Sequence, residues 1–228
     1  MIDDGRFEQA TWLMAEVDHR REWWTAERHP FYVRWSAGEL TAQDLQAYAE
    51  EHHHVAATLA DVTRRGAALA DGLLAEELIR HARERDAELD MWSEFALAAG
   101  WPPSAAWWFG AEPLPETELS AARWAGDGER SLAMHLVTLY ALETAMADVA
   151  RPLLDALMGC YGFSRIASLA YFERRLRGDA GATGLIEAGL TGLLPVADPF
   201  ALLGHAEVCY RAYWELLDGV SRTLAPAT

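Results

Sequence analysis

The sequence lacks the features that mark several common protein classes. Its only cysteines, Cys160 and Cys209, lie far apart, so we predict neither a disulfide framework nor a zinc or redox motif. A Ser-His-Asp spacing, a glycine-rich phosphate loop and a nucleotide-binding fingerprint are also missing, which removes the main support for hydrolase, kinase and dehydrogenase functions. Period-two runs of β-branched residues are missing too, so we expect almost no sheet.

Basic side chains are scarce relative to acidic ones. The chain has 19 basic and 35 acidic side chains, and its formal net charge is −16. This charge repels phosphate backbones and anionic lipid surfaces, so we expect neither a nucleic acid nor a membrane as partner. No secretion signal and no run of about 18 apolar residues is evident, and we therefore expect a cytoplasmic protein.

Apolar and aromatic side chains are abundant. Hydrophobic residues make up 51% of the 228 residues, and ten residues are tryptophan. A chain of this length buries about 70% of the surface that its unfolded form exposes, so residues 1–228 are predicted to form a single domain. Apolar residues recur every three or four positions, which predicts an all-α fold.

Capping and breaking residues predict the helix boundaries. Thr41 begins a Thr-x-x-Asp capping pattern with Asp44, which predicts a helix that starts at Ala42. Prolines are expected to end or separate helices, as at Pro30 and Pro152. We expect an HPFYVRW link after the first helix, a connector over 101–128 that packs on the body, and helices over 7–26, 42–70, 76–100, 130–152, 153–161, 164–177 and 200–224.

Glu143 is the most informative single residue, because it lies on a face of its predicted helix that is otherwise mostly apolar and is expected to face the core. Leu136, Tyr140 and Ala147 share that face. Burial raises the pKa of a carboxyl group, which suits Glu143 to proton transfer. The alternative is a structural hydrogen bond or salt bridge.

Two further helices carry polar residues on faces that are predicted to be inward. His81, Glu84 and Glu88 lie on one predicted stripe that continues to Trp92 and Phe95. His81 and Glu88 are two turns apart, so they can reach the same space between helices. The alternative is a solvated charged face. On the preceding helix Tyr48 and His52 face inward, with His53 next best placed, although a lone inward histidine is more often a structural core residue.

Four runs of sequence carry a resemblance to a known group of proteins. They are HPFYVRWSAGELTAQDLQAYAEEHH, WSEFALAAG, LLDALMGCYGFS and SLAYFERRLRGD, and they span nearly the whole chain. The first is similar to the opening of the PqqC, TenA and CADD-like group, and the others resemble the matching helices of that group. The resemblance implies a haem-oxygenase-like bundle of seven to eight helices around a central pocket, and a homodimer.

Many CADD-like members are diiron oxidases, whose ligands are a Glu and a His seven residues apart, another Glu, and a His-x-x-x-Asp-x-x-His run. At the positions of the first pair, the resemblance implies His81 and Glu88 as ligands, so the order of the glutamate and the histidine is exchanged. At the position of the next glutamate it implies Glu143 as a ligand. The positions of the last run hold Arg175, Asp179 and Ala182. Protonated arginine cannot ligate iron and its charge opposes a dication, so we expect no cofactor. The alternative is iron held by His81, Glu88, Glu143 and Asp179.

PqqC-like members close rings without a metal, and the chain also resembles the haem-oxygenase-like enzyme of prodiginine pigment biosynthesis. We therefore expect an enzyme of specialised metabolism that promotes ring closure of a small carbonyl- or pyrrole-containing substrate by acid-base catalysis. The alternatives are a mono- or diiron oxygenase and a small-metabolite binding protein. The expected catalytic residues are Glu143, His81, Arg175, His52, Glu88 and Asp179, and the expected substrate-binding residues are Tyr48, His53, Trp92, Tyr140 and Tyr171.

Overall fold

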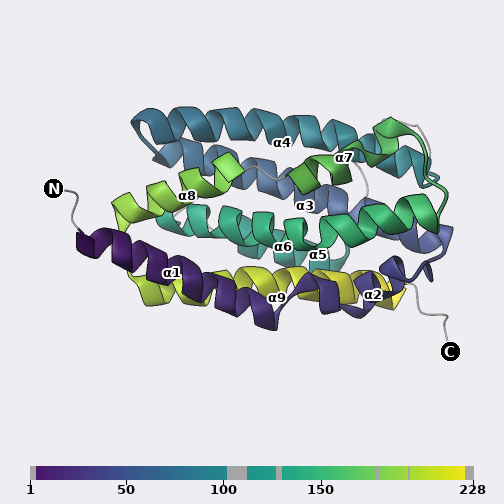
Figure 1. Cartoon of the computed structure of the whole chain (residues 1–228), viewed down its shortest axis with the longest axis horizontal. Coiled ribbons are helices and arrows are strands. Elements are labelled where there is room, and N and C mark those ends of the chain that lie inside the picture. The colour runs from purple at the N-terminus through teal and green to yellow at the C-terminus, as the bar shows by residue number, and fades with distance from the viewer. Residues whose placement is uncertain (1–3, 102–111, 127–129, 178–179, 195, 224–228) are drawn as a thin grey trace.

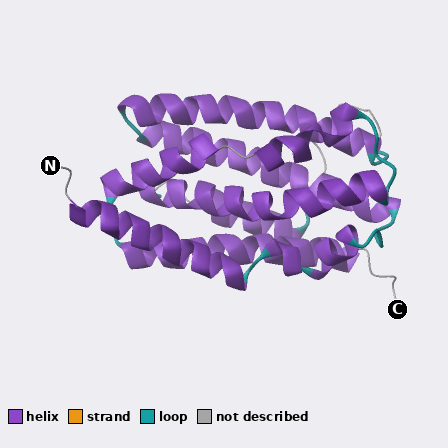
Figure 2. Ribbon diagram, in the orientation of Figure 1, coloured by secondary structure: helices purple, strands orange, loops and turns teal. Residues whose placement is uncertain are grey.

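A computed structural model describes residues 4–101, 112–126, 130–177, 180–194 and 196–223. These residues form helices joined by short loops and no strand (Figure 2). The helices are α1 (Asp4–Trp23), η1 (Ala26–Arg28, a 3₁₀ turn), α2 (Pro30–Ser36), α3 (Ala42–Leu69), α4 (Gly72–Ala98), α5 (Pro115–Ala125), α6 (Leu132–Gly159), α7 (Ile166–Arg177), α8 (Ala180–Leu193) and α9 (Pro199–Thr223). The prediction of an all-α fold is confirmed.

The helices lie along the long axis of an elongated bundle (Figure 1). α4 and α3 form one edge, and α1, α2 and α9 form the opposite edge, with α6 between the two. α7 and α8 follow one another across the front of the bundle, so that each covers part of α6. The result is that side chains of α3, α4, α6 and α7 face one another in the interior.

α6 is the central helix, and its composition reflects that position. Within the described part of the chain it is the one helix long and apolar enough to cross a membrane, which the sequence reading did not anticipate. Of its most apolar window, 67% is buried against the other helices. A helix that packs on neighbours around most of its circumference must be apolar on most faces, and burial therefore accounts for this composition.

The HPFYVRW segment was expected to be a link, but it forms α2. His29 caps this helix, because its Nδ1 accepts a hydrogen bond from the backbone N–H of Phe31 at 3.1 Å. Pro30 then occupies the first helical position, where its missing N–H costs nothing and its fixed φ favours the helix. Proline starts this helix rather than excluding one, and α2 brings Tyr32 and Trp35 into the core.

Several other predicted boundaries need correction. The capping box of Thr41 and Asp44 is present and α3 begins at Ala42 as predicted. α6, however, continues through Pro152 to Gly159, because the residues that follow the proline, such as Leu153 and Leu157, are buried on the same helix. Their burial offsets the roughly 3 kcal/mol that an interior proline costs. Besides α2, two helices were not predicted as separate elements: α5 within the expected connector, and α8.

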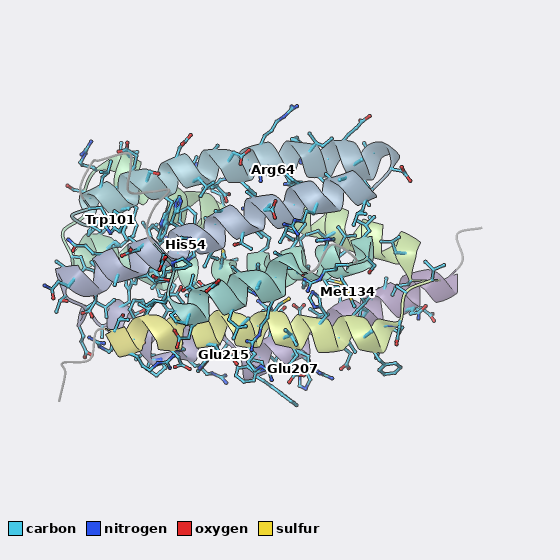
Figure 3. The ribbon with its side chains drawn as sticks, turned by 180° about the vertical axis from the view of Figure 1, so that it is seen from behind. His54, Arg64, Trp101, Met134, Glu207 and Glu215 are labelled. Atoms are coloured by element: carbon cyan, nitrogen blue, oxygen red, sulfur yellow. The ribbon has the colours of Figure 1, made fainter. Side chains whose placement is uncertain are left out.

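Ion pairs join the outer face of α9 to neighbouring helices along one side of the bundle. Figure 3 shows Glu207 and Glu215 along this helix. Glu207 accepts a hydrogen bond from Arg20 of α1 at 2.6 Å, and Glu215 pairs with Arg123 of α5. Pairs this exposed contribute on the order of 0–1 kcal/mol each, so the buried face of α9 supplies most of its attachment.

Gly38, in the turn between α2 and α3, is a position where only glycine fits. Its φ is +74°, and a Cβ added there would lie 2.8 Å from Cβ of Cys160. We expect Gly38→Ala to lower the free energy of unfolding by about 1–3 kcal/mol, through left-handed backbone strain and the clash. Chemical denaturation measures this difference.

Gly204→Ala is the matched control for that substitution. Gly204 lies inside α9, and apart from the local backbone of that helix no atom would come within 4 Å of an added Cβ. Alanine there should be neutral or should stabilise by up to about 1 kcal/mol, because glycine is a poor helix former. Equal effects of the two substitutions would contradict the structural role of Gly38.

Candidate active site

The candidate site begins with a stripe of side chains on one face of α4. His81, Arg85, Glu88 and Trp92 follow one another at spacings of four, three and four residues, which places them on the same side of a helix. All four are buried. The sequence reading assigned Glu84 to this stripe, but Glu84 is part-exposed and Arg85 takes the inward position.

Two arginines and two glutamates from α4, α6 and α7 form a closed ring of alternating charge, which we call the charge ring (Arg85, Glu88, Arg175 and Glu143). Arg85 donates to Oε2 of Glu88 at 2.5 Å and lies 3.0 Å from Oε1 of Glu143. Arg175 donates to Oε2 of Glu143 at 2.7 Å and to Oε2 of Glu88 at 2.8 Å. Each carboxylate therefore contacts both guanidinium groups, and the four formal charges sum to zero.

Burial makes the charge ring act as a unit. The side chains of Arg85, Glu88 and Arg175 are 3–5% exposed, whereas that of Glu143 is 17% exposed. Taking a charge out of water costs several kcal/mol, and only close partners offset this cost. Burial by itself lowers the pKa of Arg175, but Tyr171, Glu143 and Glu88 outweigh it and hold that pKa above its ordinary value. Arg175 is therefore a permanent cation.

A chain of buried hydroxyl and imidazole groups leads away from the charge ring. It begins where the guanidinium of Arg175 lies over the ring of Tyr171, 5.2 Å from its centroid. The hydroxyl of Tyr171 is 2.8 Å from Nε2 of His52, whose Nδ1 is 3.0 Å from the hydroxyl of Tyr48. Two further contacts of 2.6 Å extend it through Tyr32 to Tyr213. We call this the Tyr-His chain (Tyr171, His52, Tyr48, Tyr32 and Tyr213).

His52 is neutral in the folded protein. Burial, followed by the charges of Arg175 and His53, lowers its pKa to about 3. A neutral imidazole has one donor and one acceptor nitrogen, so one neighbouring tyrosine donates to His52 and the other accepts from it. Burial also raises the pKa of Tyr171 to about 12. The chain can therefore relay a proton by exchanging its hydrogen bonds without any member holding a charge at neutral pH.

Two small cavities adjoin these groups. One, of about 20 Å³, is lined by His81, Arg85 and Glu143, together with apolar residues that include Leu185 and Ile186 of α8. The other, of about 10 Å³, lies between His52, Tyr171 and Arg175 and the apolar side chains of α6. Each has room for about one water molecule. Leu185 and Ile186 of α8 close one side of the cavity beside Arg85.

Comparison with known proteins gives this geometry a family context. The chain is 33% identical over 160 residues to a 4-aminobenzoate synthase of Chlamydia trachomatis, a match that covers 66% of this chain and 67% of the relative. The chain belongs to the family of this synthase. No family model matches the chain.

Solved structures confirm the fold expected for the family. A TenA homologue from Pseudomonas syringae pv. tomato superposes with a TM-score of 0.77 at 14% identity, covering 94% of this chain and 93% of that one. A domain with a haem-oxygenase-like fold from Shewanella denitrificans superposes with a TM-score of 0.68 at 18% identity, covering 98% and 94%. The predicted haem-oxygenase-like fold of the TenA group is confirmed. The relationship to the chlamydial synthase supports a biosynthetic enzyme.

The residues present do not fit the diiron centre that the resemblance implied. Glu88 and Glu143 meet in the charge ring, and His81 lines the same small cavity as Glu143, but its Nδ1 lies 3.3 Å from Glu84. Arg85 and Arg175 fill the space between the two carboxylates and contact both. A metal ion there would stand against two permanent cations. Among the residues that the structure describes, no three His, Cys, Asp or Glu side chains are placed to hold a metal. Asp179 lies outside the described residues.

The other predicted site residues are divided between the site and the surrounding core. Tyr48, His52 and Tyr171 belong to the Tyr-His chain. Trp92 donates to the backbone carbonyl of Ala49 at 2.8 Å and packs 4.7 Å from the ring of Tyr171, as part of the core. The site residues that the sequence reading missed are Arg85, Tyr32 and Tyr213. Arg85 could have been found from its spacing of four from His81 and three from Glu88, whereas only the fold brings Tyr32 and Tyr213 to Tyr48.

Two predicted substrate-binding residues point elsewhere. The hydroxyl of Tyr140 donates to Asp18 of α1, at 3.1 and 3.2 Å to its two oxygens, and not toward the charge ring. His53 is half-buried beside His54, with ring centroids 6.0 Å apart, and belongs to neither the charge ring nor the Tyr-His chain. Ala147, which was expected on the inward face with Glu143, is exposed. The helical face that leads to the charge ring is therefore narrower than the sequence suggested.

The lowered pKa of His52 predicts how stability depends on pH. The unfolded chain binds a proton at His52 below about pH 6.5, while the folded chain does so only near pH 3. This stabilisation is fully present above pH 6.5 and is lost as the pH falls from 6.5 toward 3. We expect the free energy of unfolding, measured by urea titration, to decline over that window.

A His52→Gln variant should show a shallower decline in unfolding free energy, because its side chain does not titrate. The substitution should also destabilise the protein at pH 7 by about 1–3 kcal/mol, since a tyrosine hydroxyl loses its partner. His19→Gln is the control, because the side chain of His19 is 54% exposed. An unchanged pH slope in His52→Gln would show that another group governs the decline.

Proposed function

We propose that the chain is a biosynthetic enzyme that works without a metal and promotes ring closure of a small carbonyl- or pyrrole-containing substrate by condensation or dehydration. One observation carries this proposal: His81, Arg85 and Glu143 face a single buried cavity, and the charge ring stands where iron ligands were expected. These groups can donate hydrogen bonds and move protons, which is the chemistry that a condensation requires.

The proposed reaction assigns a role to each group at the cavity. A nucleophilic nitrogen or carbon of the substrate attacks its carbonyl carbon while the N–H groups of Arg85 donate hydrogen bonds to the carbonyl oxygen. Glu143 or His81 accepts the proton that the nucleophile releases. That proton is passed to the carbonyl oxygen, which becomes a hydroxyl group. A second proton, taken by the same base from the nucleophilic atom or from the carbon beside the former carbonyl carbon, then goes to this hydroxyl group, which leaves as water as a double bond forms. No electron is gained or lost, so the sequence of steps needs no redox partner.

The basic side chains of the protein restrict which catalytic mechanisms are available to it. All 19 are arginine, so the chain has no lysine amine that could form a Schiff base with a carbonyl substrate. Arginine does not release its proton in proteins, which leaves histidine, tyrosine and the carboxylates to move protons. The thiols are poorly placed for nucleophilic chemistry: burial raises the pKa of Cys209 to about 12, and Cys160 is exposed at the end of α6.

Metabolite conversion tests this function. Purified protein is treated with a chelator and incubated with a small-molecule extract, and the products are compared by mass spectrometry. We expect a product lighter than the consumed compound by one water, formed without consumption of oxygen. Glu143→Gln should reduce the rate by a factor of about 10² or more, as expected for loss of a proton carrier. A product heavier by one oxygen atom, or activity restored only by ferrous iron, would show an oxygenase instead.

Formation of 4-aminobenzoate is the second candidate, and the relationship to the chlamydial synthase favours it. The chain should then restore growth of a 4-aminobenzoate auxotroph. Under the leading proposal it should not, because the charge ring differs from the ligand set expected of CADD-like diiron oxidases. Growth at the rate supported by the chlamydial protein would replace the leading proposal. Empty vector and the chlamydial gene are the two controls.

A further inference from the structure

Glu143 is held in the way that a bound carboxylate ligand would be held. Its Oε1 lies 3.0 Å from a nitrogen of Arg85, and its Oε2 accepts a hydrogen bond from Arg175 at 2.7 Å. Two guanidinium groups therefore grip the two oxygens of one carboxylate from different helices. This arrangement is strong and geometrically specific for carboxylates.

Glu143 is also the member of the charge ring that can most easily leave. Its side chain is 17% exposed, against 3% for Glu88, and it borders the cavity of about 20 Å³ that it shares with Arg85. Glu88, in contrast, has an additional cation near it, because Nε of Arg174 lies 3.7 Å from its Oε1. Displacement of Glu143 would leave two buried guanidinium groups facing a single remaining carboxylate.

Charge balance then determines what can take the place of Glu143. The charge ring is neutral with Glu143 in place, and without it the ring carries one excess positive charge in a buried site. Nε of Arg175 is a further buried donor, and it donates no hydrogen bond in the structure. A ligand with a carboxylate restores neutrality and can use these donors, whereas an uncharged ligand cannot.

We propose that Arg85 and Arg175 form a receptor for a carboxylate group of the substrate, and that Glu143 occupies this receptor until the substrate displaces it. This inference rests on the proposed function and adds to it a substrate class: small compounds that bear a carboxylate. The released Glu143 is then free beside the substrate, where it can take up the proton that the reaction sets free.

Chemical rescue of Glu143→Ala tests the receptor. This substitution removes a carboxymethyl group, and acetate has the same heavy atoms as the removed group. We expect acetate to raise the melting temperature of Glu143→Ala saturably, with an affinity at least about tenfold above that for acetamide, because only acetate gains charge-assisted hydrogen bonds. Chloride keeps the ionic strength equal in all samples.

Two variants serve as controls. Asp148→Ala removes another half-buried carboxylate of α6, which is held by Arg21 alone at 2.7 and 2.8 Å, and acetate should stabilise it no more than acetamide does. In the double variant Arg85→Gln with Glu143→Ala, one of the two guanidinium groups is missing, and the preference for acetate should disappear. If Glu143→Ala does not fold by itself, the same comparison is made on the yield of refolded protein.

The outcomes separate this inference from the proposed function. Equal stabilisation of Glu143→Ala by acetate and acetamide, or rescue that persists in the double variant, would overturn the receptor. If acetate rescues the variant but turnover of the wild-type protein requires iron, the receptor stands and the metal-independent function fails. If turnover is independent of metal but acetate does not rescue, the function stands and the receptor fails.

Discussion

The neutrality of the buried charge ring is the constraint on which the interior of this protein depends. Arg85 and Arg175 are permanent cations inside a helical bundle, and they are tolerated there because Glu88 and Glu143 contact both of them. The three helices that supply these residues must keep their relative positions for all four contacts to exist. The ring therefore holds α4, α6 and α7 together beside the small cavity that His81 and Arg85 line.

The Tyr-His chain extends the same principle with uncharged groups. Burial lowers the pKa of His52 and raises that of Tyr171, so the chain stays neutral beside the permanent charge of Arg175. Each hydroxyl and each imidazole nitrogen in it has a partner, which a buried polar group needs. Charged and neutral networks thus meet at Tyr171 and Arg175, one helical turn apart on α7. The cation–π contact of Arg175 with Tyr171 places the charge ring beside hydrogen-bonding groups of α2, α3 and α9.

The charge ring differs from the ligand set that the resemblance implied in the cations that neutralise its carboxylates. The resemblance to CADD-like diiron oxidases implied carboxylates and histidines around a metal, and the chain keeps the carboxylates Glu88 and Glu143. Guanidinium groups now neutralise them. A guanidinium cannot polarise oxygen species as a metal does, but it donates several hydrogen bonds in a fixed geometry. This difference in chemistry is the reason that we propose acid-base catalysis for a protein whose relatives are named for another reaction.

The sequence by itself determined the all-α fold, the capped start of α3 and the inward position of Glu143, His81 and His52, because these follow from helical periodicity and local hydrogen bonds. It did not reveal that α2 is a helix or that α6 passes through Pro152, since in both cases burial against distant residues outweighs a local proline signal. Arg85 looked like part of a solvated charged face for the same reason. Only the tertiary structure brought Glu143 to within hydrogen-bonding distance of Arg85 and brought Arg175 to the same carboxylates. The low polarity of the interior then made those contacts obligatory.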